Sequence, residues 1–372
     1  MAELKIQFLD VGQGDGIFIQ FPGGGTMLVD LGSTKNKGLV STDILQYFKG
    51  HTKFANPGVT LDYLILTHAD RDHYNMVLEF IKGLDVKVAR LMHGGSPDEY
   101  KIPKQTDGSK AKNLIEKIVE LCPGVVQVKA TGYFPFPLKH DDFGGAEVHV
   151  LAANTPATSH SDEGWRKNTA SIVLMLVYGK ARVILAGDAT ADTEKFVTGL
   201  IPTSALSSHV LKVGHHGSHR TSNTVPWIKA VRPEFVFISA DRYGSLDDNT
   251  ATGHRLPQTL TLDLIEKHSD LLYKNCVSHN VISAYDSDDY DGYNKKPDVP
   301  NDNVPYPRKG KEWLQTATQL GIFTSLVGMD MTQSNASEAD QGAQYQLSIS
   351  GQSVLDITST WGTGHLASVQ LK

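Results

Sequence analysis

The sequence predicts an α+β fold in four layers, in which two β-sheets pack face to face, helices cover their outer faces, and a small β-rich appendage follows at the C-terminus. Three observations support this fold class. Apolar strand-like segments occur in two runs, each interleaved with helical segments. Glycine-rich hairpin connections join the first strands and indicate an antiparallel sheet margin. After about Tyr285 an acidic stretch begins, so we predict domains at 1–285 and 286–372, the latter comprising a linker and the appendage.

Patterning assigns the elements of the first run. Alternating polar and apolar residues predict strands, and apolar residues three or four positions apart predict helices. In chain order the predicted strands are 4–11, 17–21, 26–31, 61–66 and 86–92, and the predicted helices are 41–49, 72–82 and 110–121.

The second run repeats this alternation of strands and helices. Its predicted strands are 146–151, 170–177, 181–186, 209–213 and 234–239, its helices are 191–200 and 260–268, and the appendage carries strands at 345–349, 354–357 and 365–371. Two runs of the same kind fit two sheets that pack together with helices outside.

The composition is that of an ordinary globular protein. The 372 residues are 40% hydrophobic and 20% charged. A net charge of -6 argues against a globally basic nucleic-acid coat, although bound divalent cations would invert the sign locally. No apolar run approaches the roughly 18 residues that span a bilayer, so we expect no membrane partner. The strand-like N-terminus predicts no signal peptide, and the two cysteines, Cys122 and Cys276, fit a reducing cytoplasm.

The segment Thr67–His73 places two histidines and two aspartates directly after an apolar strand. His68, Asp70 and Asp72 alternate, so their side chains share one side of an extended turn, and His73 follows as the predicted helix begins. Imidazole and carboxylate ligands of this kind bind divalent first-row metals. Surface loops also gather such residues without binding metal, but two further segments supply more ligands.

Both further segments carry candidate ligands at the end of a strand. Asp188 follows Gly187 at the tip of one strand, where it could also cap the next helix. His215, His216 and His219 lie in a glycine-flanked loop after another strand. Three histidines within five residues are rarely structural, so the sequence predicts one metal site built from distant segments.

These segments resemble the metallo-β-lactamase superfamily, and within it the branch that contains the hydrolase domain of the DNA-uptake protein ComEC. The resemblance covers roughly residues 4–285 and implies a metallo-β-lactamase-like hydrolase domain. It rests on five motifs in the order typical of that branch: Asp10 to Asp15, His68 to His73, Asn168 to Ser171, Gly187-Asp188, and Leu211 to Ser218.

The resemblance implies a centre of two divalent ions, Zn²⁺ or Mn²⁺. Asp188 would bridge the ions, and His68 and Asp70 would hold one of them. The other ion would bind Asp72, His73 and one of the pair His215 and His216. We favour His215 because it lies nearer the strand end, which leaves His216 to face the substrate.

Two positions depart from the commonest superfamily pattern. Asp70 stands where a histidine is usual, which hardens the site toward oxygen-loving ions such as Mn²⁺. Asn168 stands where the third histidine of the same ion is usual, so we expect it to support the site or contact substrate. Asp30 would orient a metal-binding imidazole through its other ring nitrogen. His254, with Arg255, could contact a phosphate or merely precede and cap the helix 260–268.

The leading functional hypothesis is a metal-dependent hydrolase of phosphodiester bonds, and in its specific form a nuclease that acts on nucleic acid. A metal-activated hydroxide would attack, Asp72 and Asp188 would orient it, and His216 would stabilise or protonate the leaving oxygen. Two alternatives remain open. One is hydrolysis of another ester, such as a phosphocholine ester or a lactone. The other is a metal-binding effector module whose appendage recognises a protein partner.

Overall fold

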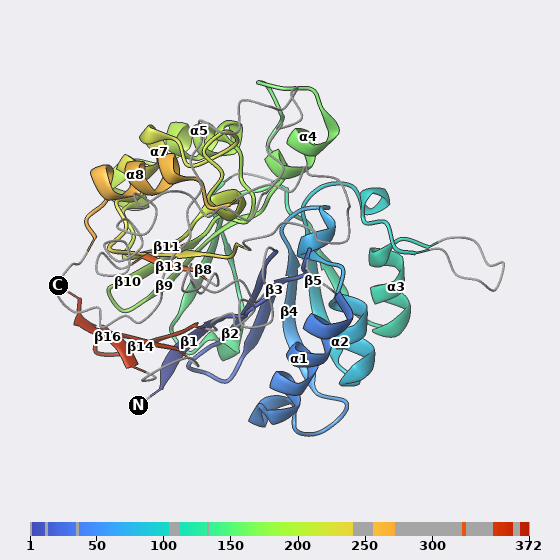
Figure 1. Cartoon of the computed structure of the whole chain (residues 1–372). Coiled ribbons are helices and arrows are strands. Elements are labelled where there is room, and N and C mark those ends of the chain that lie inside the picture. Colours follow the sequence, from blue (N-terminus) through green and yellow to red (C-terminus); the bar gives the residue numbers. More distant parts are fainter. Residues whose placement is uncertain are drawn as a thin grey trace, which may run out of the picture.

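Two mixed β-sheets pack face to face with helices on both outer faces (Figure 1), which confirms the predicted four-layer α+β sandwich. The architecture is taken from a computed structural model of the chain. The residues that it describes are 2–11, 14–34, 37–103, 112–131, 134–240, 256–271, 322–324, 345–359 and 365–371.

The first sheet has the strand order β16-β15-β14-β1-β2-β3-β4-β5-β6. In this order the pairs β14-β1, β1-β2 and β2-β3 are antiparallel, whereas the pairs β3-β4, β4-β5 and β5-β6 are parallel. The hairpins β1-β2 and β2-β3 are those that the glycine-rich turns predict. The strands span Glu3–Phe8 (β1), Gly16–Gln20 (β2), Thr26–Leu31 (β3), Thr60–Leu66 (β4), Lys87–His93 (β5), Val126–Val128 (β6), Tyr345–Ser350 (β14), Val354–Ser359 (β15) and His365–Gln370 (β16).

The second sheet repeats this change of direction in the order β13-β12-β11-β10-β9-β8-β7. Strands β7 to β10 are antiparallel, and β10 to β13 are parallel. The strands span Phe136–Leu138 (β7), Glu147–Ala152 (β8), Val173–Tyr178 (β9), Ala181–Leu185 (β10), Val210–Lys212 (β11), Phe235–Ile238 (β12) and Ile322–Thr324 (β13).

Helices cover the outer face of each sheet. Helices α1, α2 and α3 lie against the first sheet, and α5, α7 and α8 lie against the second (Figure 1). Their bounds are Lys37–Gly50 (α1), Val77–Gly83 (α2), Leu114–Leu121 (α3), Glu163–Thr169 (α4), Ala191–Leu200 (α5), Thr203–Leu206 (α6), Val225–Val231 (α7) and Thr259–His268 (α8). Among the described residues no helix is both long and apolar enough to cross a bilayer.

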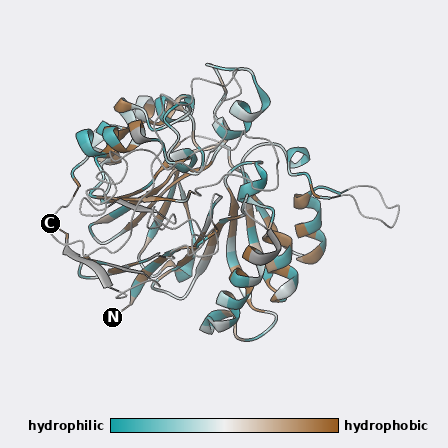
Figure 2. Ribbon diagram, viewed as in Figure 1, coloured by the Kyte–Doolittle hydropathy of each residue, from teal (hydrophilic) through white to brown (hydrophobic). Residues whose placement is uncertain are grey.

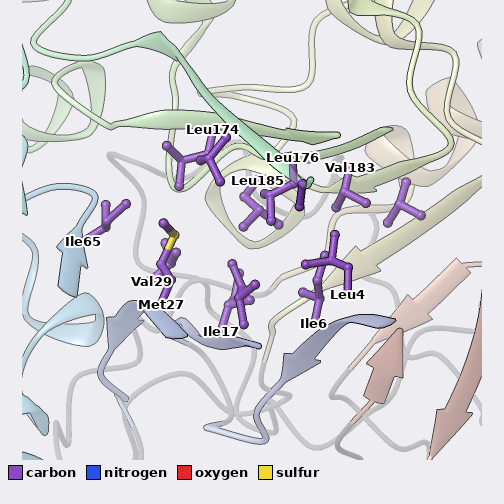
Figure 3. Close-up of a cluster of buried hydrophobic side chains, with 14 of the residues drawn as sticks. Leu4, Ile6, Ile17, Met27, Val29, Ile65, Leu174, Leu176, Val183 and Leu185 are labelled. Carbon is purple, nitrogen blue, oxygen red and sulfur yellow. The ribbon is translucent and has the colours of Figure 1, made fainter. Parts of the chain in front are cut away.

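The layer between the two sheets is the largest apolar core. Side chains such as Ile6, Ile17 and Val29 of the first sheet point toward Leu174 and Leu185 of the second (Figure 3). Hydropathy is distributed accordingly, with apolar residues on the inward faces of the outer helices and polar ones outside (Figure 2). Burial of this apolar surface holds the two sheets at a fixed separation, so the loops at their edges are held at a fixed distance as well.

The C-terminal strands extend the first sheet instead of forming a sheet of their own. β14 pairs with β1 from Glu3–Ser350 to Phe8–Tyr345, and Leu347 and Ile349 are fully buried in the shared core. Alternation predicts these strands but not their partner, because pairing register depends on tertiary context. The predicted boundary at 285/286 lies outside the described residues, so the division into two domains stays a prediction.

The helix predicted at 72–82 begins later in the structure. Arg71–His73 forms a single 3₁₀ turn, and α2 starts only at Val77. The sequence pattern gave no sign of this break. It matters because Asp72 and His73 lie in the tight turn, where they face the second sheet, and not along a helix.

Candidate metal centre

The candidate ligands lie where the carboxyl ends of parallel strands from both sheets meet. His68 to His73 follow β4, and Asp30 lies at the end of β3. From the second sheet, Asp188 follows β10 and His215 and His216 follow β11. The structure thus brings together segments more than a hundred residues apart, as the sequence predicts.

Two glycines permit the close approach that positions Asp72. A Cβ atom on Gly14 would lie 2.6 Å from the carbonyl oxygen of Asp72, and one on Gly32 would lie 2.4 Å from its carbonyl carbon. The peptide N–H of Asp15 donates to the Asp72 carbonyl oxygen at 3.1 Å. The glycine-rich loop of the first motif therefore serves to hold the Asp72–His73 turn by backbone contact.

Asp188 is the centre of the site. Its Oδ2 atom faces the Nε2 atoms of four histidines: His73 at 3.3 Å, His216 at 3.4 Å, and His68 and His215 at 3.9 Å each. Its peptide N–H donates to Ser171 Oγ at 3.3 Å, which explains the serine of the third motif. One carboxylate oxygen that faces several imidazoles has the geometry of a ligand shared by cations.

The ligand atoms are buried and carry no hydrogen bond. Among the described residues, the Nε2 atoms of His68, His73 and His216 lack any hydrogen-bond partner. Such orphaned buried atoms are costly unless they bind something. Within the part of the chain that the structure describes, four groups of three His and Asp side chains have ligand atoms within 4.8 Å of one another, and two of these groups consist only of candidate ligands: His68, His73 and Asp188, and Asp72, His73 and His216. The residues present therefore fit divalent cations.

Asp30 orients the imidazoles of His68 and His73. Its Oδ2 lies 2.8 Å from His73 Nδ1 and accepts the Thr67 hydroxyl at 2.6 Å. Because the Thr67 proton points to Asp30, Thr67 Oγ1 is left to accept from His68 Nδ1 at 3.0 Å. Both imidazoles thereby carry a proton at Nδ1 and direct Nε2 into the site, so loss of an Nε2 proton leaves the tautomer that a metal requires. This is the position expected for Asp30 from the sequence.

The pair His215 and His216 differs from expectation. His216 is 1% exposed, its Nδ1 donates to the Ser239 carbonyl oxygen at 2.7 Å, and its Nε2 lies 3.5 Å from Asp72 Oδ2. His215 is more exposed, and its Nδ1 lies 2.6 Å from Thr221 Oγ1. The geometry favours His216 as the ligand that joins Asp72 and His73, the reverse of the sequence-based preference for His215.

Comparison with known proteins agrees with this geometry. The family model of the metallo-beta-lactamase superfamily matches residues 9–225, more than half of the chain. The chain belongs to the metallo-beta-lactamase superfamily. That superfamily is hydrolytic and binds divalent metals, so the four-layer fold and the cluster of histidines and aspartates have a common explanation.

Two curated relatives are similar to this chain. It is 29% identical over 310 residues to ComE operon protein 3 of Bacillus subtilis (strain 168), which covers 77% of this chain and 35% of that protein. It is 27% identical over 240 residues to Recombination protein 2 of Haemophilus influenzae, covering 64% and 24%. The ComEC-type resemblance is thereby confirmed. The chain spans only about a third or less of the length of either relative.

Two solved structures are similar to this chain at lower sequence identity. Igni18, a metallo hydrolase from Ignicoccus hospitalis KIN4/I, has a TM-score of 0.40 at 14% identity, covering 72% of this chain and 94% of its own. A diphosphatase from the PhnP family has a TM-score of 0.39 at 12% identity, with coverage of 72% and 94%.

Asp70, one departure from the usual superfamily pattern, contacts α4, the helix that carries the other departure, Asn168. Asp70 Oδ1 is 3.8 Å from the ammonium of Lys167, the residue before Asn168 on α4. Asn168 is buried, and its Oδ1 has no hydrogen-bond partner among the described residues. Trp165 Nε1 anchors the same helix by donating to Asp192 Oδ2 at 3.0 Å. His254 lies outside the described residues, so its predicted phosphate contact stays a prediction.

Some residues of the centre were missed by sequence reasoning. Lys212, Asp15 and Thr67 lie within the motif segments, but the sequence pattern assigns them no role, and Lys167 lies just outside the third motif. The signal was present for Lys212, because a charged residue within the apolar strand segment Val210–Val213 requires a partner. No sequence signal identifies Lys167.

Electrostatics in the metal-free protein place protons where cations would bind. Burial alone lowers the pKa of His216, but Asp188 and Asp72 outweigh it and raise that pKa to about 9. Burial likewise opposes protonation of His73, yet Asp188 and Asp30 raise its pKa well above the ordinary value. Burial raises the pKa of Asp70 to about 6, and neighbouring Asp72 acts in the same direction. Cations must displace these protons, since ligands bind metals in their deprotonated form.

Metal binding should therefore release protons. At pH 7.5 the His73 and His216 imidazoles of the metal-free protein are protonated, so titration with Mn²⁺ should transfer protons to the buffer and affinity should rise as pH increases from 6 to 9. Calorimetric titration in two buffers of different ionisation enthalpy measures this transfer directly. Equal binding enthalpies in both buffers would contradict the assignment of these imidazoles as ligands.

Asp30→Asn should weaken metal binding by about 10- to 100-fold, the usual cost of removing an outer partner of a metal ligand. The amide nitrogen would favour the wrong tautomer of His73. Glu116→Gln on α3 is a control, because the Glu116 carboxylate also accepts a backbone N–H, that of Asn113 at 3.1 Å, but belongs to none of the candidate ligand groups among the described residues. Calorimetric affinities for Mn²⁺ compare the two, and an equal loss in both would refute the role of Asp30.

Proposed function

We propose that this chain is a metal-dependent hydrolase of phosphodiester bonds, with nucleic acid as the substrate class. The observation that carries the proposal is the carboxylate content of the centre. Asp70, Asp72 and Asp188 together face the histidine ligands, whereas the commonest superfamily cluster has histidine in place of Asp70. Oxygen ligands favour hard cations such as Mn²⁺ over a purely nitrogen-bound Zn²⁺, and hard cations suit charged phosphate oxygens.

The geometry supports a division of ligands between two cations. Asp72, His73 and His216 would hold one, and His68 and Asp70 would hold the other, with Asp188 shared between them. Asn168 Oδ1 is a buried acceptor without a hydrogen bond among the described residues, and it stands where the superfamily usually has a third histidine for the second cation. We therefore assign Asn168 to that cation as an amide ligand. Zn²⁺ remains the alternative metal.

The residues of the chain orient the reacting groups. Bound divalent cations would supply neutralisation of a phosphoryl oxygen and a lowered pKa for a nearby water. Burial opposes the ionisation of Asp72 and Asp188, but His216 and His73 hold the pKa of both well below the ordinary value. Both carboxylates therefore stay ionised at neutral pH. They would accept hydrogen bonds from the attacking water and fix its direction of approach.

His215 is better placed than His216 to handle the proton of the leaving oxygen. The His215 side chain is 20% exposed, whereas that of His216 is 1% exposed, with Nδ1 donating to Ser239 and Nε2 facing Asp188. An imidazole with access to solvent can donate a proton and be reprotonated. We therefore exchange the roles expected from the sequence, with His216 as ligand and His215 as general acid.

The relatives support the choice of phosphodiesters over lactones or β-lactams. One of them is named for recombination, a process in which DNA strands are broken and joined. The first motif, the metal-binding segments and the loop after β11 all match the ComEC-type branch, whose resemblance is to a DNA-uptake hydrolase domain. For a hydrolase that acts in DNA uptake or recombination, the ester bond available for cleavage is the phosphodiester of nucleic acid.

A substrate panel with Mn²⁺ tests the proposal. We expect hydrolysis of bis(p-nitrophenyl) phosphate and of single- or double-stranded DNA. A lactone and a phosphocholine ester, each assayed separately, represent the alternative ester substrates. Asp188→Ala should lower kcat by on the order of 10²-fold or more, the loss that follows removal of one group stabilising the transition state. Turnover of the lactone or the phosphocholine ester without turnover of any phosphodiester would assign the site to another ester.

Two variants control for unrelated effects. His149→Ala removes a histidine of β8 whose Nε2 pairs with Glu147 at 2.8 Å, outside the centre, and should leave kcat unchanged. Asp70→His restores the commoner ligand and should shift the metal preference toward Zn²⁺. Unaltered phosphodiester hydrolysis in Asp188→Ala would contradict the mechanism.

A further inference from the structure

A buried lysine lies beside the bridging carboxylate. Lys212 is the last residue of β11, is fully buried, and carries its ammonium into the centre. Nothing in the proposed mechanism uses it. A fixed cation next to a cation site should by simple Coulomb repulsion weaken metal binding, so its presence requires an explanation.

The ammonium has three oxygen neighbours from two segments. It forms an ion pair with Asp15 Oδ2, donates to the Gly187 carbonyl oxygen at 3.2 Å, and lies 3.9 Å from Asp188 Oδ1. Pairing with Asp15 alone would satisfy the charge. The other two contacts are a hydrogen bond to the Gly187 carbonyl oxygen and a longer ion pair with Asp188 Oδ1, so Lys212 contacts the Gly187–Asp188 segment as well as Asp15.

The two oxygens of Asp188 consequently face different groups. Oδ2 faces the imidazole Nε2 atoms of His68, His73, His215 and His216, between 3.3 and 3.9 Å away. Oδ1 instead lies 3.9 Å from the Lys212 ammonium. A carboxylate free to rotate could instead offer both oxygens to a single cation.

We propose that Lys212 is a positioning residue that holds Asp188 Oδ1 and so leaves Oδ2 alone to bridge two cations. The inference rests on the two-cation centre proposed above and specifies how its bridge is built. Gly187 adopts a left-handed conformation with φ +53°, and Lys212 fixes the carbonyl on one side of that turn and the carboxylate on the other. The strand register places Lys212 next to Leu185. It thereby determines which oxygen of Asp188 faces the cations.

The inference predicts an effect opposite in sign to that of charge alone. Removing an ammonium near the ligands should strengthen cation binding if the charge were all that mattered. If Lys212 positions Asp188, its removal should weaken binding of the second cation by about 10- to 100-fold, as loss of an outer partner of a metal ligand usually does.

A charge-matched double variant separates the two effects. Lys212→Met alone would leave Asp15 as an unpaired buried charge, which is strongly destabilising. Asp15→Asn with Lys212→Met removes both charges of the pair and leaves the net charge unchanged. Asp15→Asn with Lys212→Gln is a second version that keeps a neutral donor, and Asp15→Asn alone is the control that retains Lys212 on Asp188.

The measurements are calorimetric titration with Mn²⁺ and the electron paramagnetic resonance spectrum of the loaded protein, with circular dichroism to verify folding. The wild type should bind two ions and show the spectrum of a coupled Mn²⁺ pair. Both double variants should keep the first ion, lose about tenfold or more in affinity for the second, and lose the coupled spectrum. The control variant should bind both ions within about threefold of the wild type.

Two results would overturn the inference. Wild-type affinity and a coupled spectrum in both double variants would show that Lys212 serves only to pair with Asp15. An equal loss in the Asp15→Asn control would assign the effect to Asp15. Neither result depends on turnover of a phosphodiester, whereas a wild type that binds fewer than two ions would overturn the two-cation centre itself.

Discussion

The hydrogen bonds of one buried carboxylate determine the geometry of the centre. Asp30 lies at the end of β3 with φ +57°, and its oxygens accept from the Thr67 peptide, the Thr67 hydroxyl and the His73 imidazole. Hydrogen bonds to a charged group contribute about 1.5–3 kcal/mol each. Through them Asp30 fixes both the position of the β4 loop and the orientation of two ligands, so the Nε2 atoms of His68 and His73 already face the site before any cation arrives.

Around this anchor the centre has an excess of buried acid. Asp15, Asp30, Asp72 and Asp188 are balanced in the metal-free protein by Lys212 and by protonated histidines. Burying so many charges is costly unless each is paired. Cations can replace the histidine protons but not Lys212, which is why the lysine determines orientation while the histidines supply ligands.

Most strands and the three ligand segments were predictable because they depend on local patterns. The strand tips after β4, β10 and β11 are visible as apolar runs followed by glycine, aspartate or histidine. The sequence could not predict which of His215 and His216 is the ligand, because both residues adopt left-handed conformations, with φ 46° and 52°. The chain therefore does not continue the alternation of the strand. The pairing of β14 with β1 and the place of Lys167 likewise depend on tertiary contacts.

The central claim is that residues from both sheets converge on two cations bridged by one oxygen of Asp188. Anomalous diffraction at the manganese edge from crystals grown with Mn²⁺ tests it most directly. The account predicts two peaks, one bounded by Asp72, His73 and His216 and one by His68 and Asp70, with Asp188 Oδ2 between them. A single peak, or a peak coordinated by both oxygens of Asp188, would contradict it.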